Sequence, residues 1–156
     1  MKTRFLVVGK IDEEYLRLGI NEYENRIKRY VPFETTIIPA IKSGSNWKST
    51  EIRKREGEKL TGHIAATDVV IILDETGKEM NSVEFAGFLQ QRFSSGVKNM
   101  IFITGGAFGI DESVRRKAHF CISLSRMTFS HQMVRLIFLE QFYRALTILN
   151  NESYHH

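Results

Sequence analysis

Cysteine, proline and long apolar runs are all scarce in this sequence of 156 residues. A single cysteine, Cys121, excludes an internal disulfide and a cysteine-rich zinc site, and it favours a reducing compartment. No apolar run approaches the length of a membrane span, and the first residues, MKTRFLVVGK, lack the apolar core and cleavage site of a signal peptide. We therefore expect a cytoplasmic protein without a membrane segment, large enough to bury a core as one domain over residues 1–156.

Phosphate-binding motifs are also missing. The glycine cluster ITGGAFGID follows the apolar run 100–103 but lacks the Lys-Ser/Thr ending of a Walker A loop. Its spacing, and its place after the fourth predicted strand, differ from those of a dinucleotide fingerprint. A glycine pair alone more often marks an ordinary strand-to-helix turn. Nothing in the sequence indicates a metal.

The net charge of +4 is carried by the last 42 residues. Residues 1–114 contain 16 basic and 16 acidic side chains, whereas residues 115–156 contain 6 basic and 2 acidic ones, together with four of the five histidines. A basic region beside a candidate site suggests a polyanionic partner such as nucleic acid. A solvated basic face is an equally good interpretation of the charge alone.

Short apolar segments alternate with amphipathic ones along the whole chain. The patterns predict strands at 3–8, 33–38, 68–73, 100–103 and 119–124, and helices at 13–30, 50–60, 81–93, 111–117 and 131–149. A flexible loop is predicted at 39–47, from Ser43, Gly44, Ser45 and Asn46. This alternation predicts a three-layer α/β fold with a mostly parallel sheet. Ligands bind outside the carboxyl ends of parallel strands, so the loops after the third, fourth and fifth strands form the candidate site.

The last predicted helix is apolar on almost every side. Only Arg135, Glu140 and Arg144 interrupt its apolar residues. A helix of this kind must be covered nearly all round. We expect the sheet to cover one side and a second copy of the chain to cover the other, which predicts a two-fold homodimer.

Five segments in order resemble one family over nearly the whole chain: VVGK, IILDETGK, ITGGAFGID, SLSRMTFSHQMVRLIFLEQFYRA and a Tyr-His near the carboxyl terminus. The family is the bacterial ribosomal RNA large subunit methyltransferase H family. The resemblance implies the SPOUT class, in which a parallel α/β sheet carries a C-terminal trefoil knot and the chain forms obligate homodimers. It also implies transfer of a methyl group from S-adenosyl-L-methionine to N3 of pseudouridine 1915 in helix 69 of 23S rRNA, in the assembled 70S ribosome.

The resemblance places the methyl-donor site at the ends of the third, fourth and fifth strands. Its residues would be Leu73, Gly105, Ser125, Arg126, Met127, Thr128, Phe129 and Ser130. Backbone groups would bind the adenine edge, while Leu73, Met127 and Phe129 would supply apolar walls. Ser130 departs from the proline that is usual in the family.

Three candidate functional residues lie in the last predicted helix, which begins at His131. His131 is expected to accept the N3 proton or to bind the base edge, and local bonding at the helix terminus is the alternative. Arg144, in the family's Tyr-Arg-Ala motif, and Arg135 are candidates for phosphate or base contacts. A structural ion pair with Glu140 is the alternative for these arginines.

Two further candidates lie in the carboxyl-terminal tail. Tyr154 and His155 match the ending of the family, in which the tail of one subunit completes the site of its partner. Tyr154 would stack on a base there. The same segment could instead be an unstructured tail.

Two other functions stay open for the chain. It could be a SPOUT methyltransferase that acts on another RNA, such as tRNA, or a catalytically inert, ribosome-associated RNA-binding module. Binding of S-adenosylmethionine would count against the inert module.

Overall fold

The computed structural model describes residues 1–42 and 46–156, so residues 43–45 of the predicted loop lie outside the described part. Within these described residues, five strands and five helices alternate. The elements are β1 (Lys2–Val8), α1 (Glu14–Ile27), β2 (Phe33–Ile38), α2 (Ser49–Thr61), β3 (Asp68–Glu79), α3 (Ser82–Ser94), β4 (Asn99–Ile103), α4 (Glu112–Arg115), β5 (Phe120–Ser123) and α5 (Met133–Leu149). Every predicted element is present, and all ends except that of β3 lie within three residues of the prediction.

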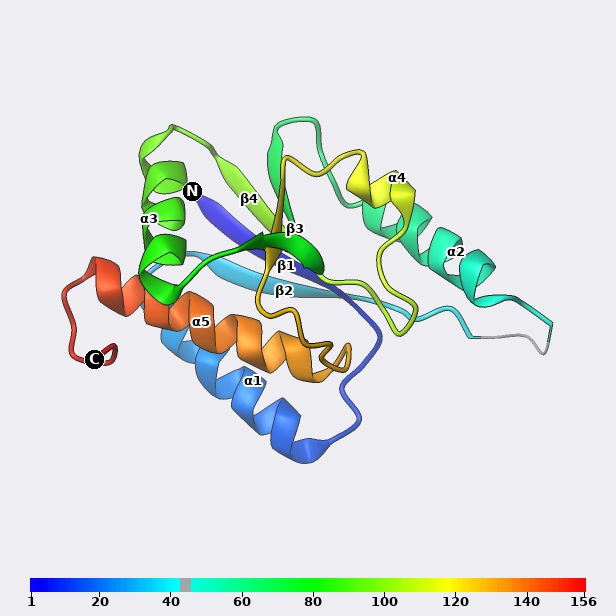
Figure 1. The fold of residues 1–156 in the computed structure, drawn as a ribbon, viewed down its shortest axis with the longest axis horizontal. Helices are drawn as coiled ribbons and strands as arrows, with labels where there is room; N and C mark the ends of the chain where they lie inside the picture. The colour runs from blue at the N-terminus through cyan, green and yellow to red at the C-terminus, as the bar shows by residue number, and fades with distance from the viewer. Residues whose placement is uncertain (43–45) are drawn as a thin grey trace.

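The strands form one sheet in the order β2-β1-β4-β3-β5, and every pair of neighbours is parallel. Successive side chains of a strand point to opposite faces, so Phe5 and Val7 enter one core while Leu6 and Val8 enter the other. Helices α1, α3 and α5 cover the first face, and α2 and α4 cover the second (Figure 1). The predicted three-layer parallel fold is confirmed.

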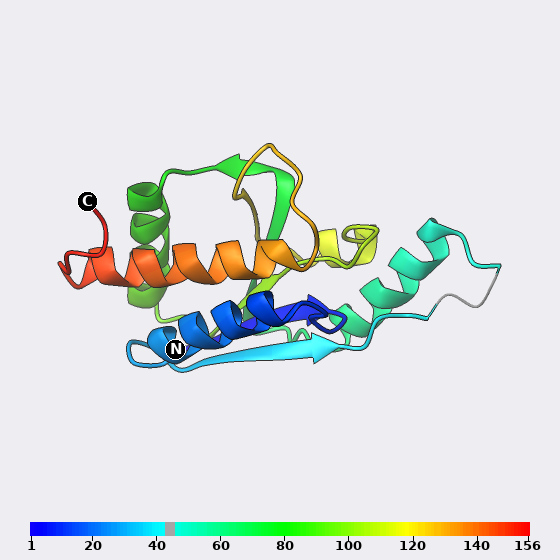
Figure 2. The ribbon, with the colours of Figure 1, turned by 90° about the horizontal axis from the view of Figure 1, so that it is seen from below.

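Strand β3 is twice as long as predicted. The sequence predicted a loop from Leu73 to Lys78, but both residues pair with Ile122, and the backbone between them shifts the register. Gly77 lies so close to β5 that a Cβ there would be 2.6 Å from the carbonyl carbon of Ile122. The Asp-Glu-Thr-Gly composition is typical of a turn, yet its glycine serves the close approach of two strands. The outer half of β3 therefore bends away from the rest of the sheet (Figure 2).

Helix α5 is covered by its own chain more fully than predicted. It packs between α1 and α3 below the sheet, and the Phe138 ring lies 4.6 Å from the Phe5 ring and 4.8 Å from the Phe102 ring (Figure 2). All residues of α5 are described, and each is at least partly buried. Two neighbouring helices of the same chain cover α5 together with the sheet, and the expected cover by a second copy of the chain stays a prediction. Within the described residues, no helix is long and apolar enough to cross a membrane.

Candidate functional site

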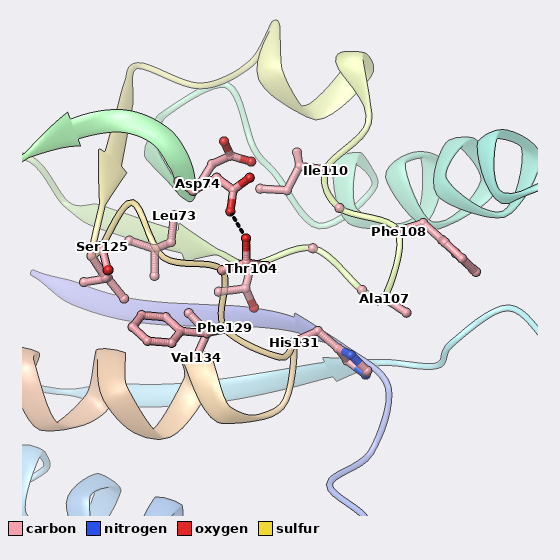
Figure 3. A pocket seen from close by; sticks show the side chains of 16 residues that line it. Leu73, Asp74, Thr104, Ala107, Phe108, Ile110, Ser125, Phe129, His131 and Val134 are labelled. Carbon is pink, nitrogen blue, oxygen red and sulfur yellow. Dashed lines mark hydrogen bonds between the residues drawn. The ribbon is translucent and has the colours of Figure 1, made fainter.

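A pocket of about 380 Å³ lies beside the bend of β3 and beyond the carboxyl end of β4 (Figure 3). Its lining comes from residues 73–75 at the bend of β3, residues 104–110 after β4, and six residues between 124 and 134. Parallel strands end at one edge of the sheet, and for this reason three segments distant in sequence meet here. The predicted convergence of strand ends is confirmed, and the volume lies within the usual range for small-molecule sites.

The glycines after β4 build a tight turn. The Gly109 amide donates a 3.1 Å hydrogen bond to the Gly106 carbonyl, which leaves Ala107 and Phe108 at the tip. Gly109 has φ +85°, and a Cβ on Gly105 would lie 2.5 Å from the carbonyl carbon and oxygen of Gly109. Gly105 is thus required because a side chain there would meet backbone, and Gly109 because its φ is one that other residues rarely adopt.

Five of the eight predicted donor-binding residues line the pocket: Leu73, Gly105, Ser125, Thr128 and Phe129. Leu73 is buried at the end of the regular part of β3, where the register with β5 shifts. The Ser125 hydroxyl accepts a 3.0 Å hydrogen bond from the Met127 amide, which shapes the start of the loop. The Thr128 hydroxyl donates a 2.7 Å hydrogen bond to the Glu75 carboxylate and joins this loop to the bend of β3.

The other three predicted donor-binding residues, Arg126, Met127 and Ser130, are not among the lining residues. Arg126 is exposed and pairs with Glu79 at 3.1 Å. Met127 is 77% exposed, so it supplies no apolar wall within this chain. The Ser130 hydroxyl accepts a 3.1 Å hydrogen bond from the Met133 amide, which fixes the entry into α5 without the proline that is usual in the family.

The lining has acidic groups and no Lys or Arg among its described residues. Asp74 and Glu75 follow Leu73 directly, and carboxylates placed right after a buried strand are a signal that the sequence analysis did not use. Burial acts to raise the pKa of Asp74, but hydrogen bonds from Thr76 and a 2.7 Å ion pair with Arg115 outweigh it, so this pKa lies below its ordinary value. Asp74 is therefore ionised at neutral pH, and the pocket suits a cationic ligand.

His131 lines the pocket just before α5. Burial and the neighbouring Arg135 lower the pKa of His131 below its ordinary value and outweigh the opposite effect of Asp12. The imidazole is therefore neutral at pH 7 and has one nitrogen free to accept a proton.

Arg135 has a structural role. It is 2% exposed, and its guanidinium donates hydrogen bonds of 2.5 Å and 2.8 Å to the carbonyl oxygens of Val8 and Gly9. Burial lowers its pKa to about 10. The prediction that Arg135 contacts RNA is wrong, because these bonds tie α5 to the carboxyl end of β1.

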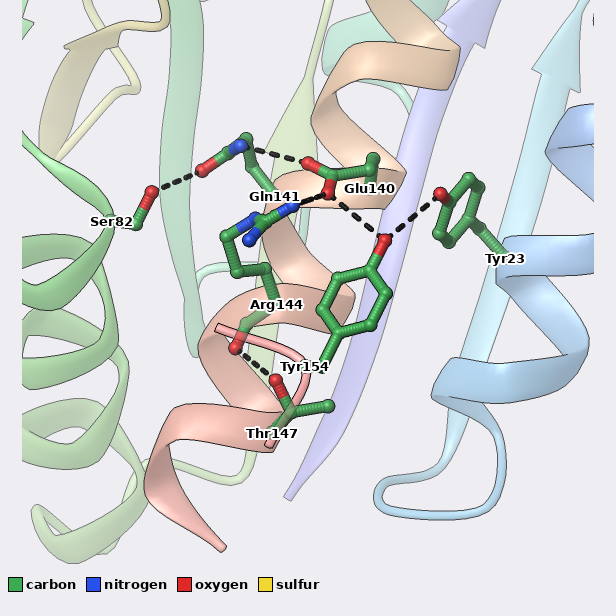
Figure 4. A network of polar contacts seen from close by, with 7 residues as sticks. All are labelled: Tyr23, Ser82, Glu140, Gln141, Arg144, Thr147 and Tyr154. Atoms are coloured by element: carbon green, nitrogen blue, oxygen red, sulfur yellow. Dashed lines mark hydrogen bonds and ion pairs between the residues drawn. The ribbon is translucent and has the colours of Figure 1, made fainter. Parts of the chain in front are cut away.

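The remaining predicted catalytic residues lie far from the pocket within one chain. Arg144 forms an ion pair with Glu140, as in the alternative interpretation of the sequence (Figure 4). Arg144 is eleven residues beyond Met133, the first residue of α5, which corresponds to roughly 16 Å along the helix axis. Within one chain, Arg144 therefore lies well away from His131 and from the pocket.

The carboxyl-terminal tail packs against α5 and α1. The Tyr154 hydroxyl lies 3.1 Å from the Glu140 carboxylate and 3.1 Å from the Tyr23 hydroxyl, and its ring centroid lies 4.7 Å from the Arg144 guanidinium carbon (Figure 4). His155 is partly buried, and its Nδ1 has no hydrogen-bond partner among the described residues. The tail is thus an ordered part of the fold, which contradicts the alternative of an unstructured segment, and its role in catalysis stays a prediction.

Within the described part of the chain, no cluster of three or more His, Cys, Asp or Glu side chains could hold a metal ion. Cys121 is partly buried, and burial raises the pKa of its thiol, which agrees with a structural cysteine.

Comparison with known proteins agrees with this geometry. The family described as Predicted SPOUT methyltransferase matches residues 1–155. A ribosomal RNA large subunit methyltransferase H from Parabacteroides distasonis is 46% identical over all of this chain and 99% of its own length, and one from Flavobacterium johnsoniae is 45% identical over the same shares. The fold is similar to that of a probable methyltransferase from Bordetella pertussis, with a TM-score of 0.57, 11% identity, and coverage of 93% of this chain and 96% of that one. The chain therefore belongs to the SPOUT methyltransferases, in the ribosomal RNA large subunit methyltransferase H family.

Proposed function

We propose that this methyltransferase transfers the methyl group of S-adenosyl-L-methionine to N3 of pseudouridine 1915, in helix 69 of 23S rRNA within the 70S ribosome. The observation that carries the proposal is the pocket where the ends of β3 and β4 meet the loop after β5. SPOUT methyltransferases use S-adenosylmethionine as the methyl donor, and the relatives named above are rRNA methyltransferases. The enzyme would act in the cytoplasm, where its substrate is assembled.

The pocket residues suit the proposed donor. S-adenosylmethionine carries a sulfonium cation, and the ionised Asp74 beside Glu75 gives the site a matching negative charge. The adenosine needs apolar walls and backbone polar groups, which Leu73, Phe129 and the turn at Gly105 supply. The donor has no phosphate group, in keeping with the absent phosphate-binding motifs.

His131 would accept the proton of the target nitrogen. Methyl transfer requires the N3 lone pair of the base to attack the methyl carbon in line as the bond from that carbon to sulfur breaks. The N3 proton then needs an acceptor beside the donor pocket, and His131 lines this pocket with a pKa that keeps it neutral. The products are the N3-methylated base, S-adenosylhomocysteine and a protonated imidazole.

A homodimer would complete the site, with Arg144, Tyr154 and His155 of one subunit reaching the pocket of the other. Supporting this, Tyr15 and Leu18 of α1 are 61% and 63% exposed, an unusual state for apolar side chains one helical turn apart. Helix α1 packs against α5 next to these residues, because Gly19 lies against Leu136. A Cβ on Gly19 would be 2.9 Å from a side-chain carbon of Leu136. A two-fold interface over α1 and the neighbouring part of α5 would cover these two exposed side chains.

The trefoil knot of the SPOUT class is part of this proposal. The chain leaves β5 at one edge of the sheet and returns to α5 below β1 and β4, where Phe138 meets Phe5 and Phe102. Such a return of the carboxyl-terminal segment is compatible with the knot.

Mass mapping of rRNA tests the proposed function. Ribosomes that lack the modification are incubated with the enzyme and donor, and the RNA is digested and mapped. A mass gain of one methyl group at pseudouridine 1915 is expected with 70S ribosomes. Methylation of deproteinised rRNA or tRNA instead would assign another substrate, and failure to bind S-adenosylmethionine in calorimetry would contradict the donor site.

A further inference from the structure

Phe108 is an exposed aromatic residue at the rim of the pocket. Its side chain is 46% exposed, whereas the apolar walls Leu73 and Ile110 are each 6% exposed. The ring points away from Leu73 and Ser125 and out of the pocket (Figure 3). It therefore leaves the interior of the pocket free and offers an aromatic surface at its opening.

The turn that carries Phe108 is fixed by close packing. Gly105 lies against the backbone of Gly109, as described above, and a Cβ on Gly106 would be 2.6 Å from the buried Glu56 carboxylate. The position of the ring is thus set before any ligand binds, which lowers the entropy cost of using it for recognition. A ring that is this exposed contributes little to the free energy of folding, because little of its apolar surface is buried.

We propose that Phe108 stacks on a base of the substrate RNA, at the target nucleotide or beside it, as that nucleotide enters the pocket. This inference rests on the proposed function. Proteins recognise unpaired RNA by stacking splayed bases on aromatic side chains, and such stacking accepts any base. Because Phe108 and His131 both border the pocket, a base held on the ring would approach the proposed proton acceptor.

Two other occupants of this surface are less well supported. The adenine of the donor would need a ring that points inward, but the Phe108 ring points outward (Figure 3). A second copy of the chain would use the exposed apolar residues of α1, and Phe108 belongs to a loop on another part of the fold. Both alternatives become outcomes of the experiment below.

The experiment compares Phe108→Ala, Phe108→Leu and Phe108→Tyr. Val83→Ala is the control, because Val83 is also apolar and 57% exposed but lies outside the pocket. The measurements are kcat/KM with 70S ribosomes, the Kd for S-adenosylmethionine by calorimetry, and the oligomeric state by sedimentation. We expect kcat/KM to fall about tenfold to a hundredfold for Ala and Leu, and to stay near the wild-type value for Tyr. The Kd and the oligomeric state should not change.

Three results would overturn the proposal. Wild-type kcat/KM in Phe108→Leu would show that an aromatic ring is not needed. A weaker donor Kd would make Phe108 a wall of the donor site, and loss of the oligomer would place it in a subunit interface. If the wild-type enzyme methylates no ribosome, the proposed function fails. The stacking proposal is then tested by equilibrium binding of the variants to ribosomes. Equal ribosome affinity of Phe108→Ala and wild type would refute stacking by Phe108.

Discussion

The hydroxyl of Thr128 donates a 2.7 Å hydrogen bond to the carboxylate of Glu75, across 53 positions of sequence. This contact joins the loop after β5 to the bend of β3 on the border of the pocket. Both side chains are exposed, so the bond is a contact between two surface segments that must stay together for the pocket to keep its shape. The loop residue Thr128 is therefore expected to affect ligand binding more than folding.

Replacing Thr128 by valine keeps the shape of the side chain and removes the donor. One such hydrogen bond contributes about 0.5–1.5 kcal/mol, so we expect donor affinity to fall about twofold to tenfold, with little change in thermal stability. Calorimetry with S-adenosylmethionine measures this. Arg126→Ala is the contrast in the same loop, because Arg126 pairs with Glu79 away from the pocket and should leave the Kd unchanged. Equal effects of the two changes would contradict the assigned role of Thr128.

Gly105 should tolerate no side chain. A Cβ there would lie 2.5 Å from the backbone of Gly109, so Gly105→Ala must displace the turn. We expect donor binding to weaken at least about tenfold, with a lower Tm. A bulkier change such as Gly105→Trp would also displace the turn. Loss of donor binding in that variant would therefore not show that the new side chain fills the pocket.

The control for this change is Gly87→Ala. Gly87 lies inside α3, and a Cβ there meets nothing within 4 Å. This substitution should raise the free energy of unfolding by about 0.5–1 kcal/mol, since glycine is a poor helix former. Wild-type donor affinity in Gly105→Ala would refute the account of the turn.

Most of the fold could be predicted from local patterns. The uninterrupted β-branched run 69–72 identified strand β3, and Asn81 with Glu84 identified the start of α3, where the two form a capping box. The outer half of β3 could not be predicted, because Gly77 pairs there with a strand more than forty residues away. Its local composition is that of a turn, and only the tertiary contact makes it a strand.

Local sequence patterns predicted which segments form the candidate site, but they did not predict which side chains of these segments face it. Leu73, Gly105 and the start of the loop after β5 lie together in the pocket. This could be predicted, because alternating strands and helices indicate a parallel sheet, in which the ends of the strands meet at one edge. Whether a loop side chain faces inward is decided by neighbours distant in sequence, such as Glu79 for Arg126. The role of Arg135 was hidden similarly, since its partners are carbonyl oxygens of β1, more than 120 positions away.

The pH dependence of the reaction should report on His131. Its pKa in the folded protein lies below 6.5, mainly because burial disfavours the charged imidazole. If His131 accepts the proton, the rate should rise with pH and should reach its plateau at a pH lower than 6.5. The unfolded chain binds more protons between the folded pKa and 6.5, so the free energy of unfolding should also rise with pH across this window.

Substituting His131 by glutamine separates these effects. The His131→Gln enzyme should lose the acid limb of the rate profile and the pH-dependent part of stability between the two pKa values. Rates across pH 5–8 and chemical denaturation at the same pH values provide the measurements. An unchanged acid limb in the variant would assign the proton to another group.

The tail offers the sharpest test of a site shared between subunits. Deleting residues 154–156 should abolish methylation and leave donor binding intact, because the tail packs on α5 far from the pocket of its own chain. Deleting only the exposed His156 is the control and should preserve activity. Loss of donor affinity in the longer deletion would show that the tail supports the fold of its own subunit.

Co-expression then identifies the subunit from which the tail acts. A chain with His131→Gln is expected to keep only a small residual rate alone, and a chain lacking residues 154–156 is expected to be inactive alone. In a mixed dimer, one pocket receives an intact His131 from the truncated chain and an intact tail from its partner. Random assembly makes half of the dimers mixed, each with one complete site, so activity should return to about a quarter of the wild-type value. If the tail served its own pocket, no mixed dimer would hold a complete site, and activity would not rise above the residual rate of the His131→Gln chain.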